Sequence, residues 1–294
     1  MRITGTSGPD LLIGQASDDT IEAFAGADSL FGADGDDSLL GFAGDDLIFG
    51  GRNATGGNDT IAGGPGNDTI YAGPGNDSVF GEGSDGESGN DLVGLGDGDD
   101  TYRETNSGAG SDTVFGGAGN DSVFLRIDGG DSEVVFAGSG DDQIIMSNED
   151  PLNGVFGGAV VGGGAGNDQI RTGAGADTVY GGSGADTIEA FGFDDPGSMT
   201  PGRGDVIWGG TGDDLIYSFN SGSNTFAYLN GHGTDRIESF EADSDRIDLT
   251  RVDGTVSIQQ STAGGNSHWV VSKGDVVVNV YGDFGDFSAA NVLG

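Results

Sequence analysis

The sequence predicts an all-β protein, built as a solenoid of short repeats and closed by a β cap towards its C-terminus. Three observations predict this class: a nine-residue repeat fills most of the chain, glycine is too frequent for a helical core, and strand-like runs follow the repeats. Of 294 residues 62 are glycine, and each glycine inside a helix costs about 1 kcal/mol. We expect two regions, a repeat region at 1–217 and a capping region at 218–294.

The repeat recurs in 18 units that we align on an aspartate at the sixth place. The fourth place is glycine in 17 units, the exception being Ser17, and the eighth is apolar or tyrosine in 17, the exception being Glu133. Glu133 therefore predicts a slip of register within 126–134. The interruptions between units are Gly-rich or polar and are expected to be surface loops. The units occupy 5–49, 54–80, 86–103, 107–124, 126–134, 137–145, 163–189 and 209–217.

Each unit combines a turn with a minimal strand. Six residues rich in Gly, Asp and Asn supply the turn, because glycine accepts positive φ and the short carboxylates bond nearby backbone. Three residues, such as Thr69, Ile70 and Tyr71, form a strand whose middle side chain points inward. Every coil then buries its apolar residue only by stacking on its neighbours, so the core is thin.

The charge and composition of the chain exclude a nucleic-acid binder, a membrane span and thiolate metal sites. There are 49 acidic and 10 basic residues, a net charge of −39. A nucleic-acid binder needs a basic surface and is excluded. No apolar run approaches the roughly 18 residues of a membrane span. Cysteine is absent, so disulfides and thiolate metal sites are excluded.

At its best-formed repeats the chain resembles the RTX, or hemolysin-type, calcium-binding proteins, whose nonapeptide consensus is GGxGxDxUx. Three units match it at every defined place: GGPGNDTIY at 63–71, GGAGNDSVF at 116–124 and GGSGADTIE at 181–189. The resemblance covers about residues 5–217. It implies a parallel β-roll in which two nonapeptides form one coil of 18 residues, and Ca²⁺ ions held between consecutive turns by sixth-place carboxylates and backbone carbonyls.

The spacing of the aspartates agrees with such metal sites. Turns 18 residues apart fall on the same edge of the roll, so Asp10, Asp28 and Asp46 should stack on one edge, with Asp19 and Asp37 on the other. Stacked carboxylates repel without a cation, and oxygen ligands favour Ca²⁺. The interruptions leave the pairing across them open. The predicted ligands are Asp10, Asp19, Asp28, Asp37, Asp46, Asp59, Asp68, Asp77, Asp91, Asp100, Asp112, Asp121, Asp142, Asp168, Asp177, Asp186 and Asp214.

The region after the repeats is predicted to form the cap. Residues 234–254 resemble the segment that follows the repeats in many RTX proteins, and the runs 256–260, 268–272 and 275–282 predict strands. The ending DFGDFSAANVLG is similar to a type I secretion signal or is an ordinary capping strand. Since the chain begins without an apolar leader, we expect secretion by the type I route to the extracellular space.

We expect a structural protein and no enzyme. The two histidines, His232 and His268, form no H-E-x-x-H motif, and no G-x-S-x-G elbow or P-loop occurs. Outward aromatics at the ninth place favour a second hypothesis, a calcium-dependent adhesin that binds a cell-surface or extracellular polysaccharide. A third is an enzyme with its site in 146–162 or 190–208. The oligomeric state stays open. The outward aromatics are Phe31, Phe49, Tyr71, Phe80, Phe115, Phe124, Tyr180 and Tyr217.

Overall fold

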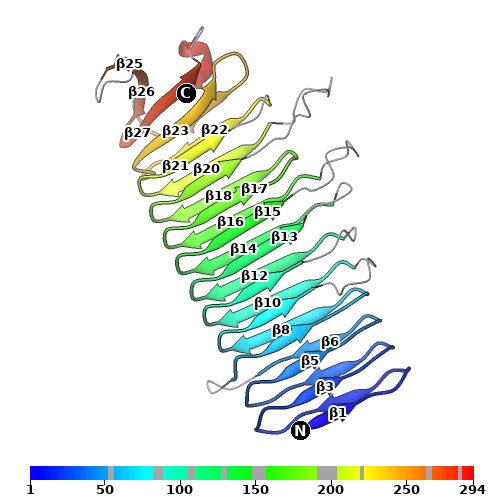
Figure 1. Ribbon diagram of the computed structural model, residues 1–294. Helices are drawn as coiled ribbons and strands as arrows, with labels where there is room; N and C mark the ends of the chain where they lie inside the picture. The colour runs from blue at the N-terminus through cyan, green and yellow to red at the C-terminus, as the bar shows by residue number, and fades with distance from the viewer. Residues whose placement is uncertain are drawn as a thin grey trace. The chain divides into compact units, whose positions relative to one another are not determined.

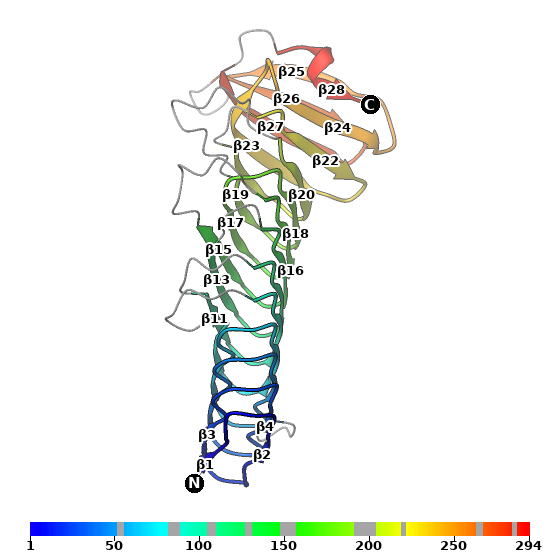
Figure 2. The same cartoon turned by 90° about the vertical axis from the view of Figure 1, so that its right-hand side faces the viewer.

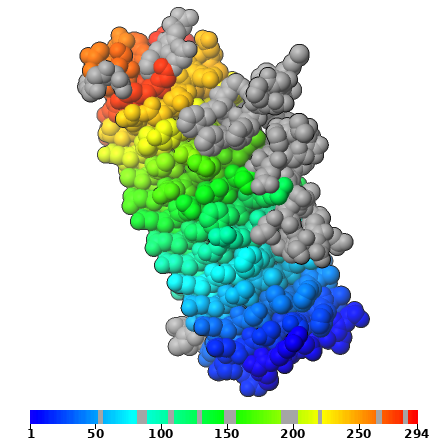
Figure 3. Space-filling model, viewed as in Figure 1, coloured from blue at the N-terminus to red at the C-terminus, as the bar shows by residue number. Residues whose placement is uncertain are grey.

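The computed structural model is all-β and divides into two compact units, residues 1–155 and 156–294. In each unit the chain winds as a solenoid whose short strands alternate between two sheets (Figures 1 and 2). Within each unit the coils follow one another in sequence order as bands in Figure 3. The predicted parallel β-roll is therefore confirmed. The residues described are 1–51, 56–81, 89–104, 110–126, 131–147, 157–190, 204–218, 222–262, 267–283 and 287–294.

In the first unit the odd-numbered strands form one sheet and the even-numbered strands form the other, both in sequence order and parallel throughout. The odd strands are β1 (Arg2–Thr4), β3 (Thr20–Glu22), β5 (Ser38–Leu40), β7 (Thr60–Ala62), β9 (Ser78–Phe80), β11 (Thr101–Arg103), β13 (Ser122–Arg126) and β15 (Gln143–Ser147). The even strands are β2 (Leu11–Ile13), β4 (Ser29–Phe31), β6 (Leu47–Phe49), β8 (Thr69–Pro74), β10 (Leu92–Asp97), β12 (Thr113–Ala118) and β14 (Val134–Ser139).

In the second unit both sheets begin parallel, and one of them ends in an antiparallel cap. One sheet runs β16 (Val160–Ala165), β18 (Thr178–Ser183), β20 (Val206–Thr211), β22 (Thr225–Leu229), β24 (Arg246–Arg251) and β28 (Val292–Leu293). The other runs β17 (Gln169–Thr172), β19 (Thr187–Ala190), β21 (Leu215–Ser218), β23 (Thr234–Glu241), β27 (Val276–Asp283), β26 (His268–Lys273) and β25 (Ser257–Ser261). A 3₁₀ turn, η2 (Ala289–Asn291), precedes β28.

The three strands expected after residue 255 are confirmed as β25, β26 and β27, and the last two strands of this sheet pair antiparallel. The parallel ladder itself continues past residue 217, because β21 pairs with β23 and β22 pairs with β24. The division at 217/218 stays a prediction. At the chain end β28 pairs with β24, so these residues add a strand to the sheet.

The eighth-place side chains form the core, as the nonapeptide frame predicts. In the three-residue strands after β1 the middle residue is buried and its neighbours are at least partly exposed, as in β4 and β6. Leu30, Ile48 and Ile70 stack in register along one sheet with no exposed surface. The fourth-place glycines supply the turn: Gly66 has φ 139°, and a Cβ there would collide with the backbone of Gly44 in the preceding coil.

The expected slip of register around Glu133 is present. Val135, two residues after Glu133, is the buried residue of β14 and pairs with Val114. Glu133 therefore occupies the sixth place that aspartate holds elsewhere. It is buried, and its Oε2 accepts a hydrogen bond from the backbone N–H of Asp112 at 2.6 Å. The unit begins two residues later than we aligned it, because the inward apolar residue decides the frame.

Candidate metal centre in the repeat turns

The sixth-place aspartates lie inside the turns. Asp10, in the first turn, is half-buried, and every other predicted ligand is at most 3% exposed. A carboxylate at this depth has lost most of its hydration, so it needs hydrogen bonds or a cation to remain charged. The turns therefore hold buried acids in rows, which a solvated acidic surface would not.

Hydrogen bonds join these aspartates into two rows in the first unit. The backbone N–H of each aspartate donates to Oδ1 of the aspartate one coil further along, over distances of 2.7–2.9 Å. One row is Asp10, Asp28, Asp46, Asp68, Asp91 and Asp112; the other is Asp19, Asp37, Asp59, Asp77, Asp100, Asp121 and Asp142. The two edges expected for the first turns are present.

The interruptions do not change the edge that a turn occupies. Asp46 and Asp68 are 22 residues apart and Asp68 and Asp91 are 23 apart, yet each pair makes the same bond as pairs 18 apart. The rows therefore continue across the interruptions. Several residues between these aspartates, including 52–55 and 82–88, lie outside the described residues.

The second unit repeats the arrangement and adds members that the alignment missed. The backbone N–H of Asp168 donates to Asp186 Oδ1, and that of Asp186 donates to Asp214 Oδ1. The row continues with the backbone N–H of Asp214, which donates to Asp235 Oδ1 at 3.0 Å. On the other edge the row passes from Ala159 through Asp177, Asp205 and Asn224 to Asp245. The missed acids share a sequence signal, an Asp two residues before a buried isoleucine: Ile207, Ile237 and Ile247.

The second carboxylate oxygen is the unusual feature of these turns. While Oδ1 accepts the bond from the neighbouring coil, Oδ2 is buried and has no hydrogen-bond partner among the described residues. This holds for Asp28, Asp37, Asp46, Asp59, Asp77, Asp100, Asp121, Asp177, Asp186 and Asp214. A buried acceptor without a partner costs about 1–3 kcal/mol, and more when it is charged. A row of such oxygens requires a compensating group in each turn.

Backbone carbonyls lie beside these oxygens in the repeats that begin with glycine. A Cβ placed on Gly41 would collide with both Asp46 Oδ2 and the Gly63 carbonyl oxygen of the next coil. At Gly181 the same two kinds of oxygen belong to Asp186 and Gly209. Among the described residues no three His, Asp or Glu side chains gather to hold a metal ion. A cation in a turn would therefore take most of its ligands from carbonyls.

The electrostatics of the rows also require a cation or protons. Burial raises the pKa of Asp59, Asp77 and Asp121 from the ordinary 3.8 to about 7, with repulsion from neighbouring aspartates acting in the same direction and the backbone N–H bonds opposing it. Burial likewise raises the pKa of Asp37 and Asp46 to about 6. The donor set is all oxygen, part carboxylate and part carbonyl, which fits Ca²⁺.

In the turns of Asp10, Asp19 and Asp112 the protein itself supplies a donor to Oδ2, and at Asp112 this donor comes from the core. Tyr102 holds an inward position on β11, and its hydroxyl donates to Asp112 Oδ2 at 2.9 Å, both groups being buried. A Cβ on Gly81 would meet this hydroxyl and Asp91 Oδ2, so the phenol reaches the space between these two turns. The predicted ligand Asp112 therefore already has a donor from the protein for its second oxygen.

The outward aromatics form short rows of stacked rings along one sheet. In the first unit Phe31 stacks on Phe49 and Phe49 on Tyr71, with ring centroids 5.1 and 5.2 Å apart. Phe115 stacks on Phe136. The sequence alignment did not place Phe136 at a ninth position, because it began that repeat unit two residues too early. Of the other predicted members, Phe80 and Phe124 lie on strands of the opposite sheet. The rings thus cover one another, as expected for aromatic side chains on neighbouring strands of one sheet.

The repeats of this chain match a known protein family. The family model of the RTX calcium-binding nonapeptide repeat matches residues 2–28, 22–54, 53–85, 106–126, 162–190 and 202–225, together more than half of the chain. No curated protein matches the sequence. Among solved structures the chain is similar to the extracellular lipase LipA from Serratia marcescens, with 18% identity and a TM-score of 0.28. That alignment covers 100% of this chain and 40% of the lipase, so the chain spans less than half of the lipase's length.

Proposed function

The chain belongs to the family built from RTX calcium-binding nonapeptide repeats, and we propose that it is a secreted structural β-roll that folds on binding several Ca²⁺ ions. The family and the fold make it a calcium-binding repeat protein. The folding switch, the extracellular role and the ligands are our proposal. Each bound ion would supply the positive charge that a row of buried carboxylates lacks.

The observation that carries the proposal is the set of buried Oδ2 atoms without partners. They recur at the same place in turn after turn, which a chance packing defect would not do. The proposed ligands are the predicted aspartates except Asp112, acting through Oδ2 where that atom has no partner, together with carbonyls of adjacent turns. Because the core is one side chain wide and the net charge is −39, removal of the cations should leave too little apolar burial to hold the coils together.

The structural role is proposed from the distribution of the acids, and the secretion from the calcium that folding would require. No helix in the described part of the chain is long and apolar enough to cross a membrane. The acids recur in rows rather than gathering in one cleft, which favours a scaffold over a catalyst. The alternative of an enzyme site in 146–162 or 190–208 falls largely outside the described residues. Calcium-gated folding is useful where calcium is abundant, as it is outside cells.

The experiment is circular dichroism of the full chain with chelator, followed by titration with Ca²⁺ and, as a control, Mg²⁺. We expect a disordered chain that gains β signal with Ca²⁺ but not with the same concentration of Mg²⁺, which prefers octahedral sites and keeps its waters. Native mass spectrometry of the folded protein should then count several bound ions. A chelated protein with an unchanged β signal would contradict the proposal.

A further inference from the structure

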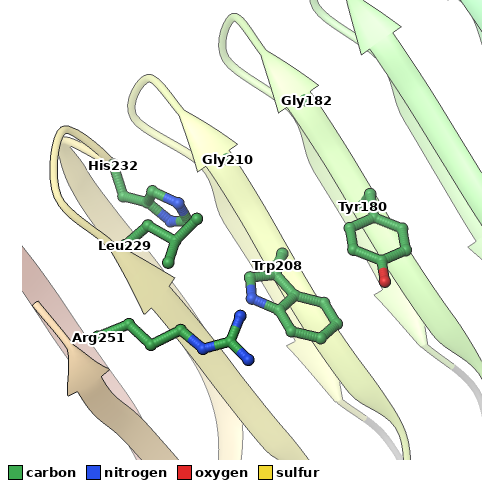
Figure 4. Close-up of a pocket in the computed structure, with 7 residues that line it drawn as sticks. All are labelled: Tyr180, Gly182, Trp208, Gly210, Leu229, His232 and Arg251. Atoms are coloured by element: carbon green, nitrogen blue, oxygen red, sulfur yellow. The ribbon is translucent and has the colours of Figure 1, made fainter.

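A pocket of the second unit combines aromatic, cationic and imidazole groups that the calcium-bound scaffold does not use. Its volume is about 430 Å³, and its walls come from β18, β20, β22 and β24 (Figure 4). Every lining residue belongs to the same unit. They are Tyr180, Gly182, Trp208, Gly210, Leu229, His232 and Arg251.

The aromatic wall is the end of a row of rings. Tyr180 and Trp208 are parallel to within 8° with ring centroids 4.8 Å apart. Carbon atoms in contact are about 3.5–4.0 Å apart, so the two rings are displaced and cover each other only in part. On β22, the next strand, the place after the Ile207–Phe226 pair is held by Ala227, whose methyl group cannot continue the row. The indole of Trp208 therefore borders the pocket on that side (Figure 4).

Two polar side chains, His232 and Arg251, also line the pocket. His232 is 4% exposed, and its Nδ1 has no hydrogen-bond partner among the described residues. Its ring is held in place by an edge contact with Tyr228, whose centroid is 5.6 Å away. In Figure 4 the guanidinium of Arg251 points towards the indole of Trp208.

The carboxylates near Arg251 in the sequence have other hydrogen-bond partners. Asp253 Oδ2 accepts from Asn230 Nδ2 at 2.9 Å, and Asp248 Oδ1 accepts from the backbone N–H of Thr250 at 2.8 Å. Within the described part of the chain Arg251 forms no ion pair within 4.0 Å. In a chain with 10 basic and 49 acidic residues, such an arginine on the rim of a pocket has donors available to a ligand.

The chemistry of these groups selects a ring that carries hydroxyls. The guanidinium of Arg251 only donates hydrogen bonds, so the ligand must supply acceptors. A hydroxyl oxygen is such an acceptor and carries no charge. The indole ring of Trp208 packs favourably against an apolar face of a ligand. A pyranose sugar has an apolar C–H face and a rim of hydroxyls, whereas an acidic sugar would be repelled by the net charge of the chain.

We propose that this pocket binds a neutral pyranose unit of a glycan, with its C–H face on Trp208 and Tyr180 and its hydroxyls hydrogen-bonded to Arg251. The glycines of the floor, Gly182 and Gly210, keep the wall free of side chains where the sugar would lie. The site goes beyond the calcium-dependent scaffold and would give it a means of attachment. It requires only that the second unit be folded.

The test is equilibrium binding of neutral oligosaccharides of glucose, mannose and galactose to the calcium-loaded full chain, with an oligogalacturonate as the acidic comparison. The chain has two tryptophans, so a Trp269→Phe variant leaves Trp208 as the sole indole and its fluorescence reports on the pocket. We expect saturable binding of at least one neutral series with a change in this emission. Trp208→Ala should weaken binding about tenfold or more, and Arg251→Ala by a similar factor.

The matched control is Tyr71→Ala. Tyr71 ends the aromatic row of the first unit and is 42% exposed, like Tyr180, but lies beside Gly94 instead of the pocket. It should leave binding unchanged, and circular dichroism should show each variant folded in calcium. Absence of saturable binding by all neutral series, binding confined to the acidic one, or equal loss in Trp208→Ala and Tyr71→Ala would each overturn the proposal. A chain that fails to fold with calcium would instead contradict the scaffold function, so the two failures are distinguishable.

Discussion

Two turns of the first unit face the same electrostatic demand and meet it differently. At Asp121, Oδ1 accepts the N–H of Asp100 while Oδ2 is buried without a partner in the described structure. At Asp112, Oδ1 accepts the N–H of Asp91, and Oδ2 accepts the hydroxyl of Tyr102. The aspartates are equivalent in the repeat. The difference lies in a neighbouring core position, where this coil has tyrosine and the other coils of the first unit have aliphatic residues.

The comparison teaches that the demand for metal is a property of the turn and its neighbours, not of the aspartate alone. A neutral phenol can satisfy an acceptor without adding charge, whereas Ca²⁺ both satisfies it and neutralises the row. We therefore expect the Tyr102–Asp112 turn to need no ion of its own. Three predictions test this difference, in decreasing order of expected effect.

The largest effect should come from pH in the presence of chelator, because it acts on many Asp121-type turns together. Burial raises the folded-state pKa of Asp59, Asp77 and Asp121 to about 7 from the ordinary 3.8. The folded chain thus binds protons more tightly than the unfolded chain, so stability is gained as pH falls towards 4 and lost as pH rises through 7.

Without calcium, circular dichroism at pH 5 should therefore show more β structure than at pH 8. With limiting calcium the dependence should reverse, because protons compete for the ligand oxygens and more Ca²⁺ is needed at pH 5. The control is saturating calcium at neutral pH, where the signal should be full. A chelated chain equally unfolded at both pH values would count against protonation of these rows.

The intermediate effect separates the two turns directly. Asp121→Ala and Asp112→Ala each remove the acceptor of one backbone N–H. The stability lost with this hydrogen bond is therefore common to both variants. Asp121→Ala should also raise the calcium concentration at the folding midpoint. Asp112→Ala should leave the buried Tyr102 hydroxyl unpaired, a cost of about 1–3 kcal/mol that calcium cannot restore.

Urea unfolding at low and at saturating calcium measures both contributions. The deficit of Asp121→Ala relative to the unsubstituted chain should depend on calcium, and that of Asp112→Ala should be the same at both concentrations. If the two deficits respond alike to calcium, the turns are equivalent and Asp112 is a ligand like the others.

The smallest effect is expected from Tyr102→Phe, which removes one oxygen atom and keeps the ring in the core. The variant should leave Asp112 Oδ2 without a donor, so that this turn resembles the turn of Asp121, whose Oδ2 has no partner in the described structure. Native mass spectrometry should detect about one additional Ca²⁺ per chain. Stability at saturating calcium should stay within about 1 kcal/mol. An unchanged ion count would mean that the phenol does not substitute for a cation.

Most of the fold and the phase of the candidate sites follow from the sequence because their causes are local. Positive φ at glycines such as Gly66, an acid two places before an inward Ile or Val, and a three-residue strand all fit within nine residues. The frame therefore predicts which aspartates enter the turns and which side chains, such as Ile70, enter the core. At Glu133 it predicts a slip of register but not the new frame, because the alignment required Asp at the sixth place, whereas a buried Glu also reaches the N–H of Asp112.

Only the tertiary structure decided what happens between coils, because those contacts join residues 18 to 28 positions apart. No local pattern tells whether an interruption moves the next turn to the other edge; the bond from Asp177 to Asp205 across 28 residues shows that it does not. The same holds for the hydroxyl of Tyr102, which the repeat counts as one more inward side chain. Its length carries it past the apolar file to Asp112, and that reach depends on the distance between coils rather than on the nonapeptide.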